Sequence, residues 1–168
     1  MSFELLLLRH AKSDWDQSCD DFDRPLNARG RHDAPRIGRW LREHDMLPDR
    51  VLSSPAHRAA QTAQAVCAQL GYPAERIVWD KRLYLAALET LLDILAEQTD
   101  HPQRLLLIGH NPGLEDLLEY LVQTPPRQHN GKLLTTATLA HVQMDTSHPT
   151  RHSAHLCQLV RPRDMSKE

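Results

Sequence analysis

The sequence predicts an α/β fold with three layers (αβα), in which helices cover both faces of a mostly parallel central sheet. Two observations lead to this prediction. Apolar runs of strand length alternate along the chain with amphipathic stretches of helical length, which is the order that parallel sheets require. The apolar runs are also almost continuous, as expected for strands covered on both faces. A length of 168 residues, without linker, repeat or low-complexity segment, predicts one domain over residues 1–168.

Four elements are expected in the first half of the chain. In order, they are a strand at 3–8, a helix at 27–42, a strand at 50–54 and a helix at 56–70. The first helix has apolar residues on one face, but Pro35 conflicts with it unless the helix starts late or kinks there. Gly71 is expected to end the second helix. The Asp-rich stretch from Asp14 to Asp23 is expected to be a polar loop.

Six more elements are expected in the second half. In order, they are a short strand at 77–79, a helix at 89–97, a strand at 104–109, a helix at 112–121, and strands at 134–144 and 154–161. Asn111 has the side chain of a helix N-cap, and Pro112 suits the first helical position. The last two strands can pair antiparallel at an edge of the sheet.

Net charge and composition argue against several kinds of partner and site. The formal net charge is −2, so a nucleic-acid or anionic-membrane surface gains no support, and we expect neither partner. The apolar run at 5–8 is too short to span a bilayer, and Glu4 precedes it where a signal peptide would be basic, which predicts a cytoplasmic protein. The three cysteines are far apart, so neither a disulfide framework nor a thiolate zinc site is expected.

Basic side chains follow three of the expected strands. Arg9 and His10 come directly after the first strand, Arg58 lies at the start of the helix after the second, and His110 follows a third. In open α/β sheets, ligands bind beyond the carboxyl ends of the strands. If these strands are neighbours, the two arginines and two histidines converge on one point, to which a helix N-terminus adds partial positive charge. His57 can contact this site or merely begin the helix, and its role stays open.

Two arginines and two histidines together suit a phosphoryl group. Guanidinium groups match phosphate oxygens bidentately and stay charged at any working pH. A neutral imidazole can attack phosphorus, and His10 is the better placed histidine for that role. His110, Arg9 and Arg58 are then expected to stabilise charge on the phosphoryl oxygens. Because the cationic cluster supplies this stabilisation, the reaction is expected to need no metal and no cofactor.

Three motifs at these strand ends resemble those of a known family. LLLLRHAKS, SSPAHRAAQTA and LLLIGHNPGL are similar to the signatures of the histidine phosphatase superfamily, which includes the phosphoglycerate mutases. The short chain, DFDRPLNARGR at 21–31 and the closing LVRPRDM make it most similar to the SixA-type phosphohistidine phosphatases. The resemblance implies a phosphoglycerate mutase-like fold with His10 as the nucleophile. The residues that it implies for holding the phosphoryl group are Arg9, Arg58 and His110, with further phosphate contacts from Arg24 and Ser13.

The chain departs from the family pattern in two places. The usual RHG reads RHA, with Ala11 in the glycine position. Many members carry a general acid between the second and third motifs, where this chain reads RLYLAALETLL and offers Glu89 as the nearest carboxylate. Glu89 is equally well explained as a first-turn helix residue, so the proton donor is either Glu89 or water. A missing acid favours substrates with good leaving groups, such as phosphohistidine in a protein.

The expected activity is hydrolysis of phosphohistidine on a histidine-phosphorylated phosphotransfer protein, through a covalent phosphohistidine intermediate. Two alternatives stay open: a small-molecule phosphoester phosphatase or mutase of the same superfamily, and a non-catalytic module that recognises phosphate. The short gap between Leu70 and Arg104 leaves little room for a lid over a small substrate, which favours a protein partner. His148, His152 and His155, like the Asp-rich stretch, are expected to belong to solvated loops and not to metal sites.

Overall fold

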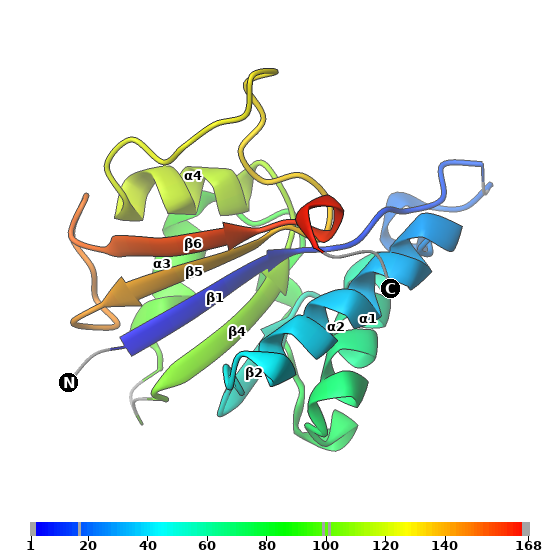
Figure 1. The fold of residues 1–168 in the computed structure, drawn as a ribbon, viewed down its shortest axis with the longest axis horizontal. Helices are drawn as coiled ribbons and strands as arrows, with labels where there is room; N and C mark the ends of the chain where they lie inside the picture. Colours follow the sequence, from blue (N-terminus) through cyan, green and yellow to red (C-terminus); the bar gives the residue numbers. More distant parts are fainter. Residues whose placement is uncertain (1–2, 17, 99, 101, 166–168) are drawn as a thin grey trace.

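The computed structural model describes residues 3–16, 18–98, 100 and 102–165 of the chain. Within these residues the centre of the protein is a six-stranded sheet in the order β3-β2-β4-β1-β5-β6 (Figure 1). The strands are β1 (Phe3–Arg9), β2 (Arg50–Ser53), β3 (Val78–Trp79), β4 (Arg104–Gly109), β5 (Leu139–Met144) and β6 (His155–Val160). Each strand predicted from the sequence is present, although some are shorter than predicted.

Most of the sheet is parallel. Strand β1 pairs parallel with β4, with Leu5 opposite Leu105, and β4 pairs parallel with β2, with Leu106 opposite Val51. Strand β5 runs antiparallel to β1 and to β6, so the expected antiparallel pairing at one edge is confirmed. The predicted α/β class, with a mostly parallel central sheet, is therefore also confirmed.

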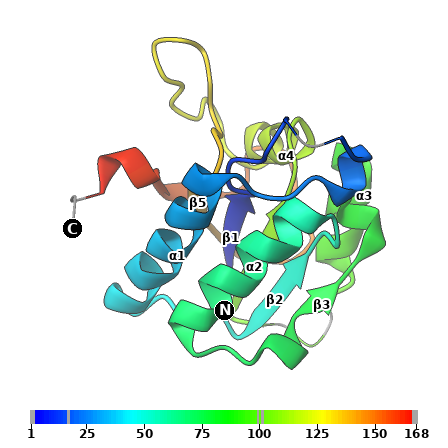
Figure 2. The ribbon, with the colours of Figure 1, turned by 90° about the vertical axis from the view of Figure 1, so that its right-hand side faces the viewer.

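Helices cover both faces of the sheet (Figures 1 and 2). Helices α1 (Ala28–Glu43) and α2 (His57–Leu70) pack on one face, and α3 (Leu88–Ala96) and α4 (Gly113–Leu121) pack on the other. Gly71 ends α2 with a φ of 70°, as predicted. None of the helices in the described part of the chain combines the length and the apolar character needed to cross a membrane.

Strand β1 shows why its sequence is apolar without interruption. Side chains alternate across a strand, so Leu5 and Leu7 face the helices α3 and α4, whereas Leu6 and Leu8 face α1 and α2. All four are completely buried. Burial of a leucine side chain contributes about 1.5–3 kcal/mol, so the strand stabilises two cores at once. This two-sided burial is the predicted three-layer arrangement.

Helix α1 runs through Pro35 and does not start late to avoid it. Asn27 caps the helix, because its Oδ1 accepts a hydrogen bond from the amide of Gly30 at 2.9 Å. An interior proline removes one main-chain hydrogen bond and costs roughly 3 kcal/mol. Burial of the apolar face that includes Ile37 and Leu41 offsets this cost.

The start of α4 differs from the prediction. The helix begins at Gly113 and not at Pro112, and Asn111 does not cap it, because its Nδ2 donates to the carbonyl oxygen of Leu134 at 2.7 Å. A Cβ on Gly113 would lie 2.1 Å from the carbonyl oxygen of Ala86, so the helix start needs glycine. The amide of Asn111 thus serves a contact between distant segments, which local spacing does not reveal.

Strand β5 begins at Leu139, later than the strand predicted over 134–144. The residues before it belong to a turn over the end of β1. The amide of Ala137 donates to the carbonyl oxygens of Arg9 and His10, each at 3.1 Å. This turn therefore occupies the carbonyl oxygens of the last residue of β1 and of the residue that follows it.

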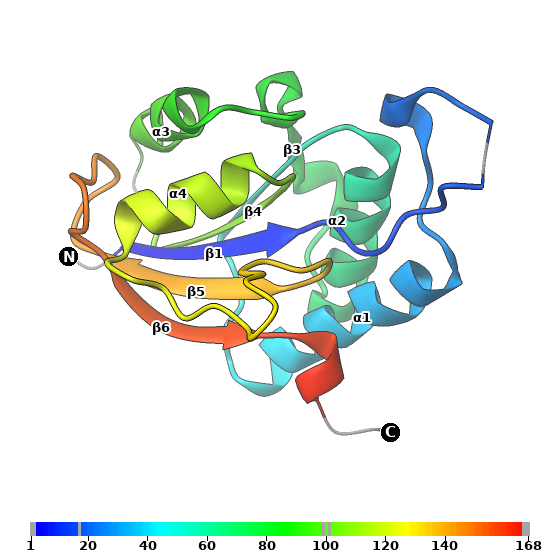
Figure 3. The same cartoon turned by 90° about the horizontal axis from the view of Figure 1, so that it is seen from above.

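The carboxyl ends of three strands lie together because β4 is placed between β1 and β2. Figure 3 shows β1 and β4 side by side, ending at the same edge of the sheet. The ladder continues for one residue beyond the strands. The amide of His10 donates to the carbonyl oxygen of Gly109 at 3.1 Å, and the amide of Ser54 donates to that of Ile108 at 3.0 Å. The residues that follow each strand therefore start from fixed positions at one edge of the sheet.

Candidate active site

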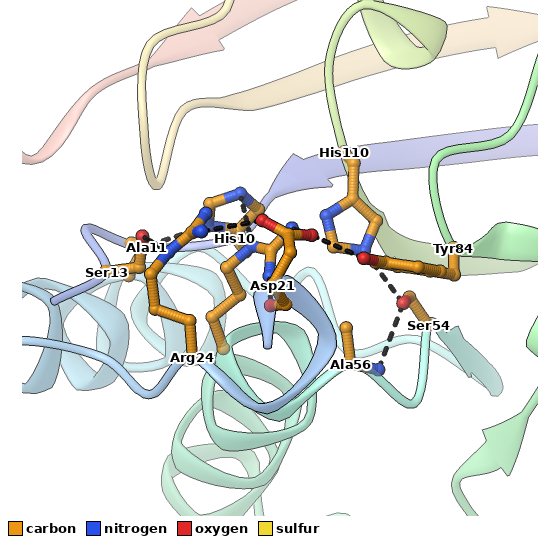
Figure 4. Close-up of polar contacts among 10 residues, drawn as sticks. His10, Ala11, Ser13, Asp21, Arg24, Ser54, Ala56, Tyr84 and His110 are labelled. Atoms are coloured by element: carbon orange, nitrogen blue, oxygen red, sulfur yellow. Dashed lines mark hydrogen bonds and ion pairs between the residues drawn. The ribbon is translucent and has the colours of Figure 1, made fainter. Parts of the chain in front are cut away.

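All six site residues predicted from the sequence line one cleft of about 220 Å³ at this edge of the sheet. They are Arg9, His10, Ser13, Arg24, Arg58 and His110. They come from the end of β1 and the loop after it, from the first turn of α2 and from the residue after β4. Figure 4 shows several of their side chains pointing toward one another. The convergence expected from neighbouring strand ends is thus observed.

The imidazole of His10 is held in one tautomer. Its Nδ1 lies 2.7 Å from the carbonyl oxygen of Ala11, and because a carbonyl only accepts, Nδ1 carries the proton. Its Nε2 therefore has a lone pair, to which Arg58 Nε donates at 3.4 Å. His10 is 6% exposed, and this burial is the main cause that lowers its pKa to about 3. At neutral pH the ring is an uncharged base whose unprotonated nitrogen lies against a guanidinium.

Thr62 fastens the loop that carries His10 to helix α2. The amide of Ala11 donates to Thr62 Oγ1 at 3.0 Å, and the Thr62 hydroxyl donates to the carbonyl oxygen of Arg58 at 2.7 Å. Both Ala11 and Thr62 are completely buried. The positions of His10 and Arg58 are therefore linked through one side chain.

His110 lies beside His10, with 5.2 Å between the ring centroids. Its Nε2 is 2.8 Å from Ser54 Oγ, which already accepts a hydrogen bond from the amide of Ala56 at 3.2 Å. The hydroxyl of Ser54 can donate its own proton to Nε2, which leaves the proton of His110 on Nδ1. That Nδ1 is buried and has no hydrogen-bond partner among the described residues. Burial, followed by the charge of Arg58, lowers the pKa of His110 to about 4.

Asp21 places a carboxylate between two of the arginines (Figure 4). Its Oδ1 accepts from Arg24 Nη1 at 2.6 Å, and its Oδ2 accepts from Arg58 Nη2 at 3.0 Å and from the hydroxyl of Tyr84. The hydrogen bond from Tyr84, assisted by the two arginines, lowers the pKa of Asp21 to about 2. At neutral pH the cleft therefore contains a charged carboxylate at the point where its cations converge.

Arg24 and Arg9 have further anchors. Arg24 Nε donates to Ser13 Oγ at 3.0 Å, and its guanidinium carbon lies 3.6 Å from the centre of the Trp15 ring. Arg9 Nη1 donates to the carbonyl oxygen of Leu134 at 3.0 Å, whereas its buried Nε has no partner among the described residues. Ser13 thus holds Arg24 in place, and the carbonyl oxygen of Leu134 holds the guanidinium of Arg9.

Comparison with known proteins gives several relatives of this chain. The model of the histidine phosphatase superfamily (branch 1) matches residues 5–83. An uncharacterised chloroplast protein of Arabidopsis thaliana is 34% identical over 130 residues, which cover 72% of this chain and 60% of that protein. The 2,3-bisphosphoglycerate-dependent phosphoglycerate mutase of Bifidobacterium longum is 40% identical over 67 residues, which cover 38% of this chain and 27% of the mutase. The chain therefore spans less than two thirds of the length of these curated relatives.

Two solved structures cover nearly the whole chain. The protein histidine phosphatase SixA complexed with tungstate covers 96% of this chain and 99% of its own, with a TM-score of 0.82 at 22% identity, which shows the shared fold. A protein of Agrobacterium tumefaciens assigned to the phosphohistidine phosphatase SixA is 31% identical, covers 95% of this chain and 99% of its own, and has a TM-score of 0.76. The chain belongs to the histidine phosphatase superfamily.

In this member of the histidine phosphatase superfamily, Glu89 lies outside the cleft. It is exposed in the first turn of α3 and borders a separate hollow together with Asp116 and Tyr120. A carboxylate in the first turn of a helix interacts favourably with the helix dipole, so the helical explanation of Glu89 is the better one. Asp21, by contrast, is a carboxylate that does line the cleft of this superfamily member.

Sequence reasoning missed Asp21 and Tyr84. The sequence predicts that Asp21 belongs to a solvated loop, and its side chain is 42% exposed, but in η1 (Asp21–Asp23) it also pairs with two site arginines, which was not predicted. One available signal was its position three residues before Arg24, the spacing at which a helical turn brings two side chains together. Tyr84 has no such signal, since it follows the short helix η3 (Lys81–Leu83) far from Asp21 in sequence.

The other histidines in the described part of the chain lie outside the cleft. His57 is exposed, and its Nδ1 lies 3.2 Å from the carbonyl oxygen of Asp23, so it links the start of α2 to η1. His148, His152 and His155 do not form a ligand cluster. Across the ranges that the structure describes, no three side chains of His, Cys, Asp or Glu gather closely enough to hold a metal ion.

Proposed function

We propose that the protein is a phosphatase that hydrolyses phosphohistidine on a protein partner through a covalent phosphohistidine at His10. The observation that carries this proposal is the state of His10, which is neutral, donates Nδ1–H to Ala11 and directs Nε2 toward Arg58. Two similar solved structures bear the name of a phosphohistidine phosphatase, which supports the choice of substrate. As part of the same proposal, residues 1–168 act as one domain in the cytoplasm.

In the first step, Nε2 of His10 attacks the phosphorus of the substrate phosphohistidine. A new P–N bond forms at Nε2, the P–N bond to the substrate breaks, and its electron pair returns to the departing imidazole nitrogen. The departing imidazole is neutral when its other nitrogen is protonated, so no carboxylic acid has to supply a proton. Arg9, Arg58 and His110 stabilise the charge on the phosphoryl oxygens.

In the second step, water releases the phosphoryl group from His10. The phosphorylated ring keeps the proton on Nδ1, which donates it in a hydrogen bond to the carbonyl oxygen of Ala11, so the ring is cationic and leaves readily. Water attacks the phosphorus, the bond to Nε2 breaks, and its electron pair returns to Nε2. Inorganic phosphate departs with the oxygen of the water and accepts its proton, which restores neutral His10.

The carboxylate in the cleft favours leaving groups that need no acid. Asp21 has a pKa of about 2, lowered chiefly by the hydrogen bond from Tyr84, so at neutral pH it has no proton to donate. Glu89 borders a different hollow. An alkoxide leaving group requires a proton, whereas the imidazole of a protonated phosphohistidine departs without one. These observations support phosphohistidine over sugar or alkyl phosphates as the substrate.

The experiment that tests the proposal is the transfer of a labelled phosphoryl group. The protein is mixed with a phosphotransfer protein that carries radiolabelled phosphohistidine, and the reaction is quenched quickly. We expect an acid-labile, base-stable label on the wild type that His10→Ala abolishes and that a metal chelator leaves unchanged. His57→Ala, an exposed histidine beside the cleft, is the matched control and should still be labelled. A label that persists in His10→Ala, or that needs a metal, contradicts the mechanism.

A second candidate is a phosphatase or mutase that acts on a small phosphoester. The sequence match to a phosphoglycerate mutase favours it. The same assay decides between the two, because a label obtained from small phosphoesters but not from the phosphorylated protein supports this second candidate. Phosphate binding without any label or phosphate release would identify a non-catalytic binding module.

A further inference from the structure

Three large apolar side chains are exposed at the cleft or next to it. Trp15 is 71% exposed, Leu85 is 55% exposed and Phe22 is 39% exposed. Trp15 and Leu85 border the cleft directly, and Phe22 packs edge-to-face on the ring of Tyr84 with 5.0 Å between the centroids. Among the described residues, six large hydrophobic side chains are exposed, and these three are half of them. We call Trp15, Phe22 and Leu85 the apolar rim, and their clustering indicates contact with another molecule.

Neither the backbone conformation nor the exposure of Leu85 favours a leucine at this position. Its φ of 50° lies in the left-handed region, which residues other than glycine and asparagine rarely adopt. Its side chain is more than half exposed, so burial gives little stability in return. Strained residues of this kind gather at binding sites, where a contact outside the chain explains them.

Acidic side chains accompany the apolar rim. Asp16, Asp20 and Asp23 are exposed in the loop that also carries Trp15 and Phe22. These carboxylates repel small anions that approach through solvent, whereas basic side chains on a partner are attracted to them. The cleft behind the rim, at about 220 Å³, accommodates a phosphorylated side chain but not the polypeptide that bears it. That polypeptide must therefore lie across the rim.

We propose that the apolar rim is a docking surface for a protein whose phosphohistidine is surrounded by apolar and basic side chains. This inference rests on the proposed function, because it takes the phosphorylated residue in the cleft to be histidine. The partner's apolar side chains pack on the rim, and its basic side chains face the carboxylates of the same loop. The rim then supplies affinity that contacts to the phosphoryl group alone do not give.

Two synthetic peptides test the docking surface, each with one phosphohistidine flanked by arginines. One peptide has leucines beside the phosphohistidine, and the other has serines at the same positions. We expect kcat/KM to be about tenfold higher for the leucine peptide, because burial of one or two leucines suffices for such a ratio. The same preference should appear in Kd on the His10→Ala protein, so its detection does not depend on turnover.

Leu85→Asn removes an apolar side chain from the rim without straining the backbone, because asparagine tolerates the left-handed conformation. We expect its preference for the leucine peptide to fall from about tenfold toward one, with a melting temperature no lower than that of the wild type. Leu47→Asn is the matched control, since Leu47 is 52% exposed and lies away from the cleft, and it should keep the preference. Free phosphohistidine, assayed in parallel, reveals any change in the chemistry itself.

Equal Kd values for the two peptides on His10→Ala would overturn the docking surface. It would also be overturned if the wild type sediments as a dimer that Leu85→Asn dissociates, because the rim would then contact a second copy of the chain. Loss of all turnover, with free phosphohistidine as well as with peptides, would refute the proposed function. A preference that persists in Kd under those circumstances would still support the docking surface.

Discussion

A single hydrogen bond determines which nitrogen of His10 can react. The carbonyl oxygen of Ala11 keeps the proton on Nδ1 and thereby leaves Nε2 with its lone pair. Burial then suppresses the protonated ring by lowering the pKa of His10 to about 3, and it lowers that of His110 to about 4. Two neutral imidazoles can therefore lie among arginines without adding to the positive charge, and both keep this state across the physiological pH range.

The two buried histidines should make the folded protein sensitive to acid. Their pKa values in the folded state are about 3 and about 4, against 6.5 in an unfolded chain, so between pH 6.5 and pH 4 the unfolded chain binds protons that the folded chain does not. The free energy of unfolding should fall as the pH drops through this window, by up to about 1.4 kcal/mol per pH unit for each histidine. Urea unfolding at several pH values measures the slope. His10→Gln should reduce it by about that amount, and an unchanged slope would contradict the assignment.

The carboxylate of Asp21 should compete with phosphate for Arg24 and Arg58. Its side chain is 42% exposed, so solvent weakens the ion pairs, and Asp21→Asn should tighten inhibition by inorganic phosphate by roughly 3–10-fold. Asp93→Asn, at an exposed position of α3 away from the cleft, is the control and should keep the wild-type inhibition constant. If phosphate inhibits Asp21→Asn less strongly than the wild type, the carboxylate positions the arginines more than it competes with the ligand.

At the scale of single elements, the sequence predicts the ends that depend on local chemistry. Gly71 ends α2 as predicted, and Asn27, predicted as the first residue of α1, lies one position before the helix and caps it, because each acts on backbone groups within its own helix. The start of α4 was not predictable in this way, since Asn111 bonds to Leu134, 23 residues further along the chain. An N-cap motif shows which hydrogen bond a side chain can make within its own helix. It does not show whether the side chain bonds instead to a distant segment of the chain.

The start of α4 should be intolerant of any side chain at Gly113. An added Cβ would lie 2.1 Å from the carbonyl oxygen of Ala86, so the backbone would have to move, and Gly113→Ala should destabilise the protein by about 1–3 kcal/mol. Gly109→Ala is the matched control, because its Cβ would meet Leu114 at 3.5 Å, an ordinary contact. Urea unfolding compares the two variants, and equal midpoints would show that the segment at Ala86 yields easily.

At the scale of the whole molecule, the order of the strands brings the cleft together. The positions of Arg9, His10 and His110 were predictable because all carboxyl ends of a parallel sheet lie at one edge. The pairing of Asp21 with Tyr84 was not, since it joins two residues 63 positions apart, and neither of them lies directly at the end of a strand. The spacing of apolar residues along the sequence predicts the strands of the sheet and where they end, whereas contacts between loops depend on the complete fold.

Because helices cover both faces of the sheet, removal of a buried side chain from either face should lower the free energy of unfolding by a similar amount. Leu106 and Leu107 are neighbours on β4, both are completely buried, and they belong to opposite cores. Leu106→Ala and Leu107→Ala should each cost about 2–5 kcal/mol of unfolding free energy. Chemical denaturation of the two variants measures both faces in one experiment. A nearly neutral result for either would mean that one helical layer packs loosely on the sheet.

The two hydrogen bonds of the Thr62 hydroxyl should limit which residues can replace Thr62 during evolution. Its hydroxyl joins the loop of His10 to the helix of Arg58, two residues 48 positions apart, yet Thr62 itself does not border the cleft. A mutation that removes the hydroxyl loosens the proposed nucleophile His10 and the guanidinium of Arg58 together, so substitutions at this position should be confined to threonine and serine. Among relatives, position 62 would then vary as little as the residues that meet the substrate, although it never touches it.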